Sequence, residues 1–236
     1  MSILRENLAR LEEAIGTACR DAGRLRDEVE LVAVSKMHPA ALMTEALGLG
    51  LHRFGENRVQ EFAAKSAELG EARRAMRVHL IGQLQSNKAV KAVEIFDAVD
   101  SVDSLKLAER LNEAAGKLQK RLPVLLEIKL SHEESKAGLG PDSTELAELI
   151  EKLPDLKNLD AQGLMTIAPF GVSDDETRAC FRELRVLRDR LAQAHTRLSL
   201  PVLSMGMSGD FALAIQEGAT RIRVGTALFG AREYAK

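Results

Sequence analysis

Three short segments of the 236-residue chain carry residue types that could do chemistry together. The first is Lys36, a single amine at the end of the apolar run 30–36. A lysine at the carboxyl end of a buried strand is desolvated, which lowers its pKa and lets the neutral amine attack a carbonyl carbon. The other two segments, 204–210 and 221–226, have the composition of turns that hold anions. Together they predict a phosphorylated aldehyde as the ligand.

The direction of the Lys36 side chain follows from strand alternation. Val32, Val34 and Lys36 share one face of the expected strand, and Leu31 and Ala33 share the other. If the first face looks into a barrel, the amine stands at the top of its interior. For an isolated lysine, a solvated strand end is the simpler interpretation; the two later segments favour the reactive one.

Two turns near the end of the chain predict the phosphate site. In the segment 204–210, Ser-Met-Gly-Met-Ser-Gly-Asp, a helix beginning near Asp210 would direct free backbone N–H groups at the ligand. Gly225 permits close backbone approach, and Thr226 adds a hydroxyl donor. Alone, Ser208 or Asp210 is explained as a helix cap and Gly225 as relief of crowding. Their joint position in the last two units of a barrel indicates phosphate binding.

Arg223 is a candidate ligand of a ring nitrogen. It lies between Ile222 and Val224, so if these face outward its guanidinium points inward. A buried cation needs a partner, which is either a ligand atom or, alternatively, Glu127 or Asp100. Opposite a pyridine nitrogen, arginine can only donate, so that nitrogen stays unprotonated and the ring is a weak electron sink. This suits a carrier or racemase-like chemistry better than transamination.

The elements that must position these residues alternate between strand and helix along the whole chain. Eight strands are expected, at residues 31–36, 52–56, 78–84, 98–102, 124–130, 161–167, 202–205 and 222–229. Helical spacing of apolar residues, for example at 105–118 and 176–194, fills the connections, and one additional helix at 4–22 precedes them. This pattern predicts an α/β fold, a single (β/α)8 TIM barrel with an N-terminal helix. An open doubly wound sheet is the alternative, but no Gly-x-Gly-x-x-Gly turn follows the first strand. The segments 131–141 and 169–175 are expected loops on the active face.

Composition sets the broad class. With 29% charged and 45% hydrophobic residues and a net charge of −2, we expect one soluble domain over residues 1–236. Lys and Arg are not clustered and Trp is absent, which argues against nucleic acid. No stretch resembles a signal peptide or a membrane span, so we expect a cytoplasmic protein. Cys19 and Cys180 lie in helical segments and are expected to be reduced, and the histidine spacing predicts no metal site.

The ordered motifs resemble those of the pyridoxal phosphate homeostasis proteins, the YggS/PROSC group. The motifs, which span nearly the whole chain, are Val32-Ala-Val-Ser-Lys36, Phe54-Gly-Glu-Asn57-Arg-Val-Gln-Glu61, His79-Leu-Ile-Gly-x-Leu-Gln-Ser-Asn-Lys88, Ser135-Lys-x-Gly138, Gly163-Leu-Met165, Ser204-Met-Gly-Met-Ser208 and Arg223-Val-Gly-Thr-x-x-Phe-Gly230. The resemblance implies a barrel related to the cofactor domain of alanine racemase.

The resemblance also implies pyridoxal 5'-phosphate (PLP) as an aldimine on Lys36. The implied cofactor-binding set comprises Ser208, Gly225 and Thr226 at the phosphate, Arg223 at the pyridine nitrogen, and Asn57, His79, Ile81 and Met165 around the ring, with Ser204 and Met207 in the phosphate-binding turn. Members of the family bind and hand on the cofactor without an established reaction of their own. Met37, where threonine is common, and Ala212, where Asp-Phe-Glu is typical, depart from the pattern.

The leading interpretation is therefore a monomeric carrier and buffer of PLP that supports its homeostasis and passes it to PLP-dependent acceptor enzymes. The first alternative is a PLP-dependent amino-acid racemase, which needs a second base on the opposite face of its substrate. The chain has one tyrosine, Tyr234, and no second domain to supply another. A Schiff-base aldolase is the third interpretation, although its lysine would more often lie on a later strand.

Overall fold

Eight parallel strands form a closed barrel in chain order. The computed structural model describes residues 2–130 and 137–230. The strands are β1 (Glu30–Val34), β2 (Arg53–Glu56), β3 (Arg77–Leu80), β4 (Ala98–Val102), β5 (Leu122–Glu127), β6 (Leu159–Met165), β7 (Val202–Ser204) and β8 (Arg221–Val224). The barrel closes where β1 pairs with β8, from Glu30 opposite Arg221 to Ala33 opposite Val224. The predicted TIM barrel is confirmed, and closure excludes the open sheet.

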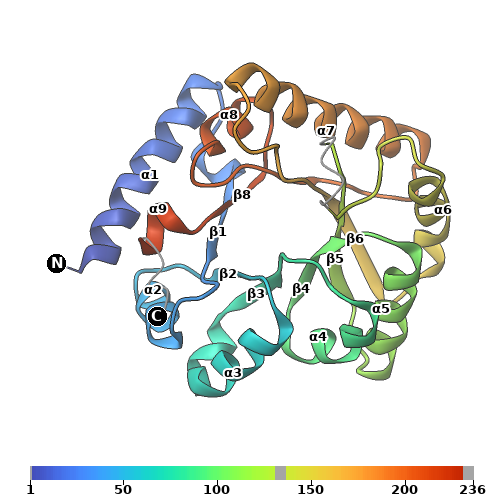
Figure 1. Ribbon diagram of the computed structural model, residues 1–236, viewed down its shortest axis with the longest axis horizontal. Coiled ribbons are helices and arrows are strands. Elements are labelled where there is room, and N and C mark those ends of the chain that lie inside the picture. The colour runs from blue at the N-terminus through green and yellow to red at the C-terminus, as the bar shows by residue number, and fades with distance from the viewer. Residues whose placement is uncertain (1, 131–136, 231–236) are drawn as a thin grey trace.

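Helices surround the strands, as Figure 1 shows. They are α1 (Ile3–Asp21), α2 (Ala40–Gly48), α3 (Val59–Leu69), α4 (Ala89–Ile95), α5 (Leu105–Lys117), α6 (Thr144–Lys152), α7 (Asp174–Ala194), α8 (Phe211–Gln216) and α9 (Thr226–Phe229). The described residues also form four 3-10 helices, each between a strand and an α-helix: η1 (Arg26–Glu28), η2 (Gly70–Ala75), η3 (Ser86–Lys88) and η4 (Leu153–Asp155).

The N-terminal helix α1 was expected at residues 4–22 and is confirmed within one residue at each end. Ser2 caps it, because its hydroxyl oxygen accepts the Arg5 N–H at 3.3 Å. A stripe of apolar residues at helical spacing, including Leu4, Leu11 and Ile15, is buried. This stripe packs α1 against α8 and α9, next to the strands where the barrel closes (Figure 1).

Alternation along the strands separates a core between sheet and helices from the interior of the barrel. In β8, Ile222 and Val224 belong to the core cluster, whereas Arg221 and Arg223 are buried on the other face. In β1, Leu31 and Ala33 join the core and Val32 faces inward. The face predicted for Arg223 is therefore the observed one.

Several strands end earlier than predicted. β8 stops at Val224, and residues 226–229, expected as strand, form α9 instead. β1 stops at Val34, which leaves Lys36 in the turn beyond it, and β3 stops at Leu80. A strand continues only while a neighbour offers backbone groups to pair with. Past the rim of the barrel, isolated bonds continue, such as that from the Ile81 N–H to the carbonyl of Glu56 at 2.9 Å, but the backbone of residues 226–229 bonds within a helix and does not extend the sheet.

We predict that Gly163→Ala destabilises the barrel. A Cβ at this position would lie 1.9 Å from the carbonyl oxygen of Val202, so β6 and β7 would have to separate. We expect the free energy of unfolding to fall by about 2 to 3 kcal/mol, measured by urea denaturation. The control is Gly48→Ala in α2, where a Cβ has no neighbour within 4 Å. Equal stability of the two variants would contradict the close approach.

Candidate functional site

The mouth of the barrel brings Lys36 beside the turn that follows β8. Because Ala33 pairs with Val224, residues 34–36 continue next to Gly225 and Thr226. A Cβ at Gly225 would lie 3.2 Å from the carbonyl oxygen of Val34, so glycine allows the two backbones to approach. Lys36 is half-buried and Thr226 is exposed. Barrel closure thus places an amine next to a hydroxyl donor.

The turn after β7 joins the same cluster. Gly206 has φ 93°, and the N–H of Met207 donates to the Asp210 carboxylate at 2.5 Å. The Ser208 hydroxyl accepts the backbone N–H of Ala227 at 3.3 Å and keeps its own hydrogen for another acceptor. The turns after β7 and β8 are therefore hydrogen-bonded to each other.

The helix expected to begin near Asp210 begins at Phe211. Asp210 is its N-cap residue, but its carboxylate turns back to Met207 and makes no side-chain capping bond. Burial raises the pKa of this carboxyl, against the effect of the Met207 N–H.

Arg223 is buried in the barrel interior and is fixed by three hydrogen bonds. It donates to the carbonyl and hydroxyl oxygens of Ser204 and to the carbonyl of Thr166, each at 2.8 Å. Burial lowers its pKa, and the carboxyl groups of Asp100 and Glu127 oppose that shift. Among the described residues, no carboxylate lies within ion-pair distance of the Arg223 guanidinium. Three of its five N–H groups are occupied, which leaves two for a ligand.

Glu127 ends β5 on the inward face, opposite Met165 in β6. It is buried, and among the described residues its Oε2 has no hydrogen-bond partner. Burial, and secondarily the Asp103 carboxylate, raises the pKa of Glu127 to about 7, although Arg223 lowers it. The predicted alternative, a direct ion pair between Glu127 and Arg223, is not formed. The orphaned oxygen is a second polar atom that a ligand in the mouth could reach.

Apolar side chains form one wall of the mouth. A Cβ at Gly55 would meet Ile81 at 2.9 Å and Val32 at 3.0 Å, so these two side chains pack over the glycine. The backbone of Asn57 packs as closely against Gly82. This wall, with the buried Met165, is the kind of surface that covers an aromatic ring.

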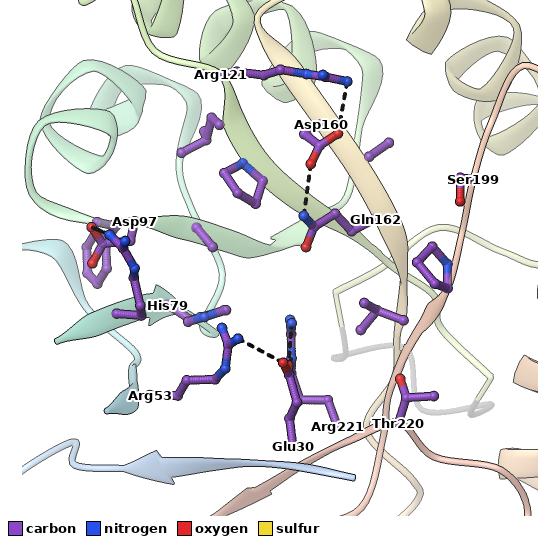
Figure 2. Close-up of a pocket in the computed structure, with 18 of the residues that line it drawn as sticks. Glu30, Arg53, His79, Asp97, Arg121, Asp160, Gln162, Ser199, Thr220 and Arg221 are labelled. Atoms are coloured by element: carbon purple, nitrogen blue, oxygen red, sulfur yellow. Dashed lines mark hydrogen bonds and ion pairs between the residues drawn. The ribbon is translucent and has the colours of Figure 1, made fainter. Parts of the chain in front are cut away.

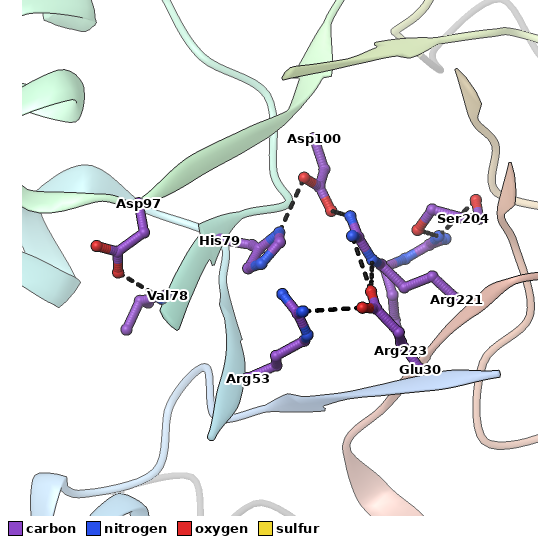
Figure 3. A network of polar contacts seen from close by, with 9 residues as sticks. All are labelled: Glu30, Arg53, Val78, His79, Asp97, Asp100, Ser204, Arg221 and Arg223. Atoms are coloured by element: carbon purple, nitrogen blue, oxygen red, sulfur yellow. Dashed lines mark hydrogen bonds and ion pairs between the residues drawn. The ribbon is translucent and has the colours of Figure 1, made fainter. Parts of the chain in front are cut away.

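His79 lies one layer deeper than Ile81 on the same face of β3. Its Nδ1 is 3.0 Å from Asp100, which also lies 3.4 Å from the Arg221 guanidinium (Figure 3). Burial raises the pKa of Asp100, but His79 and the arginines outweigh it and hold that pKa below its usual range. The structure therefore places His79 beneath the mouth rather than at its rim.

A cavity of about 870 Å³ opens at the opposite, amino-terminal end of the barrel and also contacts His79 (Figure 2). Several of its charged residues pair with each other: Arg53 with Glu30 at 2.8 Å and Arg121 with Asp160 at 2.9 Å. Arg221 joins Glu30 at 2.9 Å. Paired charges at this end of a barrel contribute to stability, whereas ligands bind at the other end.

Sequence reasoning missed two groups of contacts. One is the network that joins Arg221 to Asp100 and Asp100 to His79, although Asp100 and His79 were each named singly. The other is a cluster of Glu56, Glu61 and Lys65 behind Lys36; its signal in the sequence was the i,i+4 spacing of Glu61 and Lys65.

Other expectations concern features away from the mouth. Among the described residues, Cys19 in α1 and Cys180 in α7 are buried thiols outside any disulfide. Within residues 2–130 and 137–230, no group of three acidic, histidine or cysteine side chains could hold a metal, and no helix is long and apolar enough to cross a membrane. Ser135, Lys136 and Tyr234 lie outside the described residues.

Fold and site together define a (β/α)8 barrel whose mouth holds an amine beside the two turns that the sequence predicts to bind an anion. Comparison with protein families matches residues 5–233 to the alanine racemase N-terminal domain. The pyridoxal phosphate homeostasis protein of Pseudomonas aeruginosa is 44% identical over 235 residues, 99% of this chain and 98% of that protein. The protein of the same name from Aquifex aeolicus is 41% identical over 229 residues, 97% and 98% of the two chains. The chain belongs to the alanine racemase N-terminal domain family and, within it, to the pyridoxal phosphate homeostasis proteins.

Solved structures agree with the fold. PipY of Synechococcus elongatus, with PLP bound, has a TM-score of 0.86 at 46% identity over 96% of this chain and 100% of its own. An alanine racemase of Clostridium difficile has a TM-score of 0.72 at 20% identity, over 99% of this chain and 57% of the racemase. The second likeness concerns the fold alone.

We predict that Glu127→Gln removes a pH dependence of stability. Because the folded pKa is raised from 4.5 to about 7, the Glu127 carboxyl favours folding fully below pH 4.5 and loses that contribution as the pH rises through 7. Between pH 5 and pH 8 the unfolding free energy of the wild type should fall by about 2 kcal/mol more than that of the variant. Urea denaturation of the ligand-free proteins at both pH values measures the difference, and parallel pH profiles would contradict a neutral buried carboxyl.

Proposed function

We propose that the protein binds PLP and carries it as a Schiff base on Lys36, which buffers the cofactor and supports its homeostasis. The observation that carries this proposal is the pairing of β1 with β8, because it sets the Lys36 turn beside Gly225 and Thr226. The family relationship supports the same ligand, since relatives are named for PLP homeostasis and PipY has been solved with PLP bound.

The phosphate would be held by the turns after β7 and β8. In this proposal Ser208 and Thr226 donate their hydroxyl hydrogens, and Gly225 lets the backbone approach. The Ser208–Ala227 hydrogen bond supports it, because that bond holds the two turns together before any ligand binds. Met207, 37% exposed, would form the rim.

The ring would lie against the apolar wall. Asn57, Ile81 and Met165 would line it, with His79 closing the pocket from below. Arg223 would donate one of its two spare N–H groups to the pyridine nitrogen, and Ser204 supports this role by holding the guanidinium. Arginine keeps its proton, so the ring nitrogen would stay unprotonated. This suits a carrier or racemase-like chemistry better than transamination.

The chemistry asked of Lys36 is a reversible condensation. The bound cofactor supplies an electrophilic aldehyde carbon. The neutral Nζ adds to that carbon, two N–H protons leave with the aldehyde oxygen as water, and a carbon–nitrogen double bond remains.

The exposed position of Thr226 supports release to other proteins. We infer that PLP-dependent enzymes of the cytoplasm are the acceptors and that the carrier works as a monomer. No observation on the described residues favours racemisation, and Tyr234 lies outside them.

Replacing Lys36 tests the attachment point. Purified wild-type protein reconstituted with PLP should show the visible absorption band of a Schiff base, and Lys36→Ala should lose it. The matched control is Lys129→Ala, a lysine just beyond β5 that should keep the band. A band retained in Lys36→Ala and lost in Lys129→Ala would move the attachment to β5.

Thr226→Val tests the phosphate site, because valine preserves the shape of threonine and removes its donor. We expect PLP affinity to fall by about 1 to 3 kcal/mol, roughly 5- to 150-fold, in an absorbance titration. Thr17→Val on the exposed face of α1 is the control and should leave affinity unchanged. Unchanged affinity in Thr226→Val would place the phosphate elsewhere.

A further inference from the structure

The turn between β1 and α2 contains a strained residue directly after Lys36. Met37 has φ 62°, the left-handed region; among the described residues only Gln119, with φ 52°, is another non-glycine residue at positive φ. This conformation costs a residue with a Cβ about 1 to 2 kcal/mol, and such residues persist where the surroundings hold them. The Met37 side chain is 51% exposed, so its own packing does not account for the conformation.

Glu61 of α3 holds this turn from outside the barrel. Its Oε1 accepts the backbone N–H of Met37 at 2.5 Å and lies 2.8 Å from the Lys65 ammonium. Burial raises the pKa of Glu61, but the hydrogen bonds from Lys65 and Met37 outweigh it and lower that pKa overall. Glu61 is therefore an anion at neutral pH, and a charged acceptor makes a strong hydrogen bond.

The residue before Lys36 is tied to the same cluster. Lys65 is buried and donates to the carbonyl of Ser35 and to Glu56, both at 2.8 Å. The Ser35 hydroxyl donates to the same Glu56 oxygen at 2.7 Å. Backbone groups on both sides of Lys36 are thus anchored to α3 and β2.

Burying the charged groups of this cluster carries a desolvation cost. Burial raises the pKa of Glu56 against the effect of Lys65, and its Oε2 has no partner among the described residues. A buried ion pair of this kind is often no more stabilising than apolar packing. Because the cluster contacts the residues on both sides of Lys36, we infer that it orients the turn.

We propose that Glu61, supported by Lys65 and Glu56, is a positioning residue that keeps Met37 in the left-handed conformation and thereby directs the Lys36 amine into the mouth. The Ser35 hydroxyl is directed at the cluster, and continued alternation of side chains from β1 would direct Lys36 to the barrel interior. A pre-oriented amine loses less conformational freedom when it meets an aldehyde. The inference rests on the proposed function, because it assumes that Lys36 is the reacting amine.

A rescue experiment separates orientation from general stability. Glu61→Ala should weaken PLP binding about tenfold, because the turn loses the interaction that stabilises its strained conformation. Glycine adopts positive φ without cost, so Met37→Gly in the Glu61→Ala background should restore affinity to within about twofold of wild type. Gln119→Gly, at the other positive-φ site, is the matched control and should rescue nothing.

A second readout needs no cofactor. Hydrogen exchange of the Met37 amide, followed by NMR in the ligand-free protein, should be slow in the wild type and fast in Glu61→Ala. If Glu61→Ala does not fold, Met37→Pro keeps the side chains of Glu56, Glu61 and Lys65 but removes the N–H that Glu61 accepts and fixes φ near −65°, so it should weaken PLP binding at least tenfold.

The outcomes distinguish this inference from the proposed function. Wild-type affinity in Glu61→Ala or in Met37→Pro, or weakened affinity that Met37→Gly does not restore, overturns the positioning role while Lys36 remains the attachment point. A wild-type protein that forms no adduct at Lys36 overturns the proposed function, and the inference with it.

Discussion

Pairing of the first strand with the last is the constraint on which the site depends. Lys36 and Thr226 are separated by most of the chain, and only the register of β1 against β8 makes them neighbours. In an open sheet β1 and β8 would be free to lie apart, and the amine would have no fixed relation to the anion-binding turns. Packing of α1 on α8 and α9 covers this seam from outside. The N-terminal helix therefore contributes to the site without touching it.

The charged side chains inside the barrel lie in layers, and these layers differ in how many of their polar atoms have hydrogen-bond partners. At the amino-terminal end, Arg221 is paired with both Glu30 and Asp100 (Figure 3). One layer higher, Arg223 has protein partners for three of its N–H groups, and the Oε2 of Glu127 has no partner among the described residues. Buried polar groups without partners are costly. Since this cost is concentrated at the carboxyl end of the strands, that end is the one suited to bind a polar ligand.

Local sequence patterns predicted most of the fold. Period-two alternation gave the inward direction of Arg223, and the succession of strand and helix patterns gave the barrel. The ends of the strands were not predictable, because residues 226–229 have strand-forming side chains but no neighbour to pair with. The resemblance named His79 as a pocket residue but could not give its depth, which depends on barrel register. The anchoring of the Lys36 turn by Glu61 and Lys65 required the contacts of α3 with the turn after β1, which no local pattern contains.

The central claim is that one particular amine captures the cofactor, and mass spectrometry after borohydride reduction tests it most directly. Reduction converts a reversible carbon–nitrogen double bond into a stable amine, so the modified lysine can be located in a proteolytic digest. The account predicts a single added phosphopyridoxyl group, on the peptide that contains Lys36. An adduct on another lysine, or no added mass at saturating PLP, would contradict it.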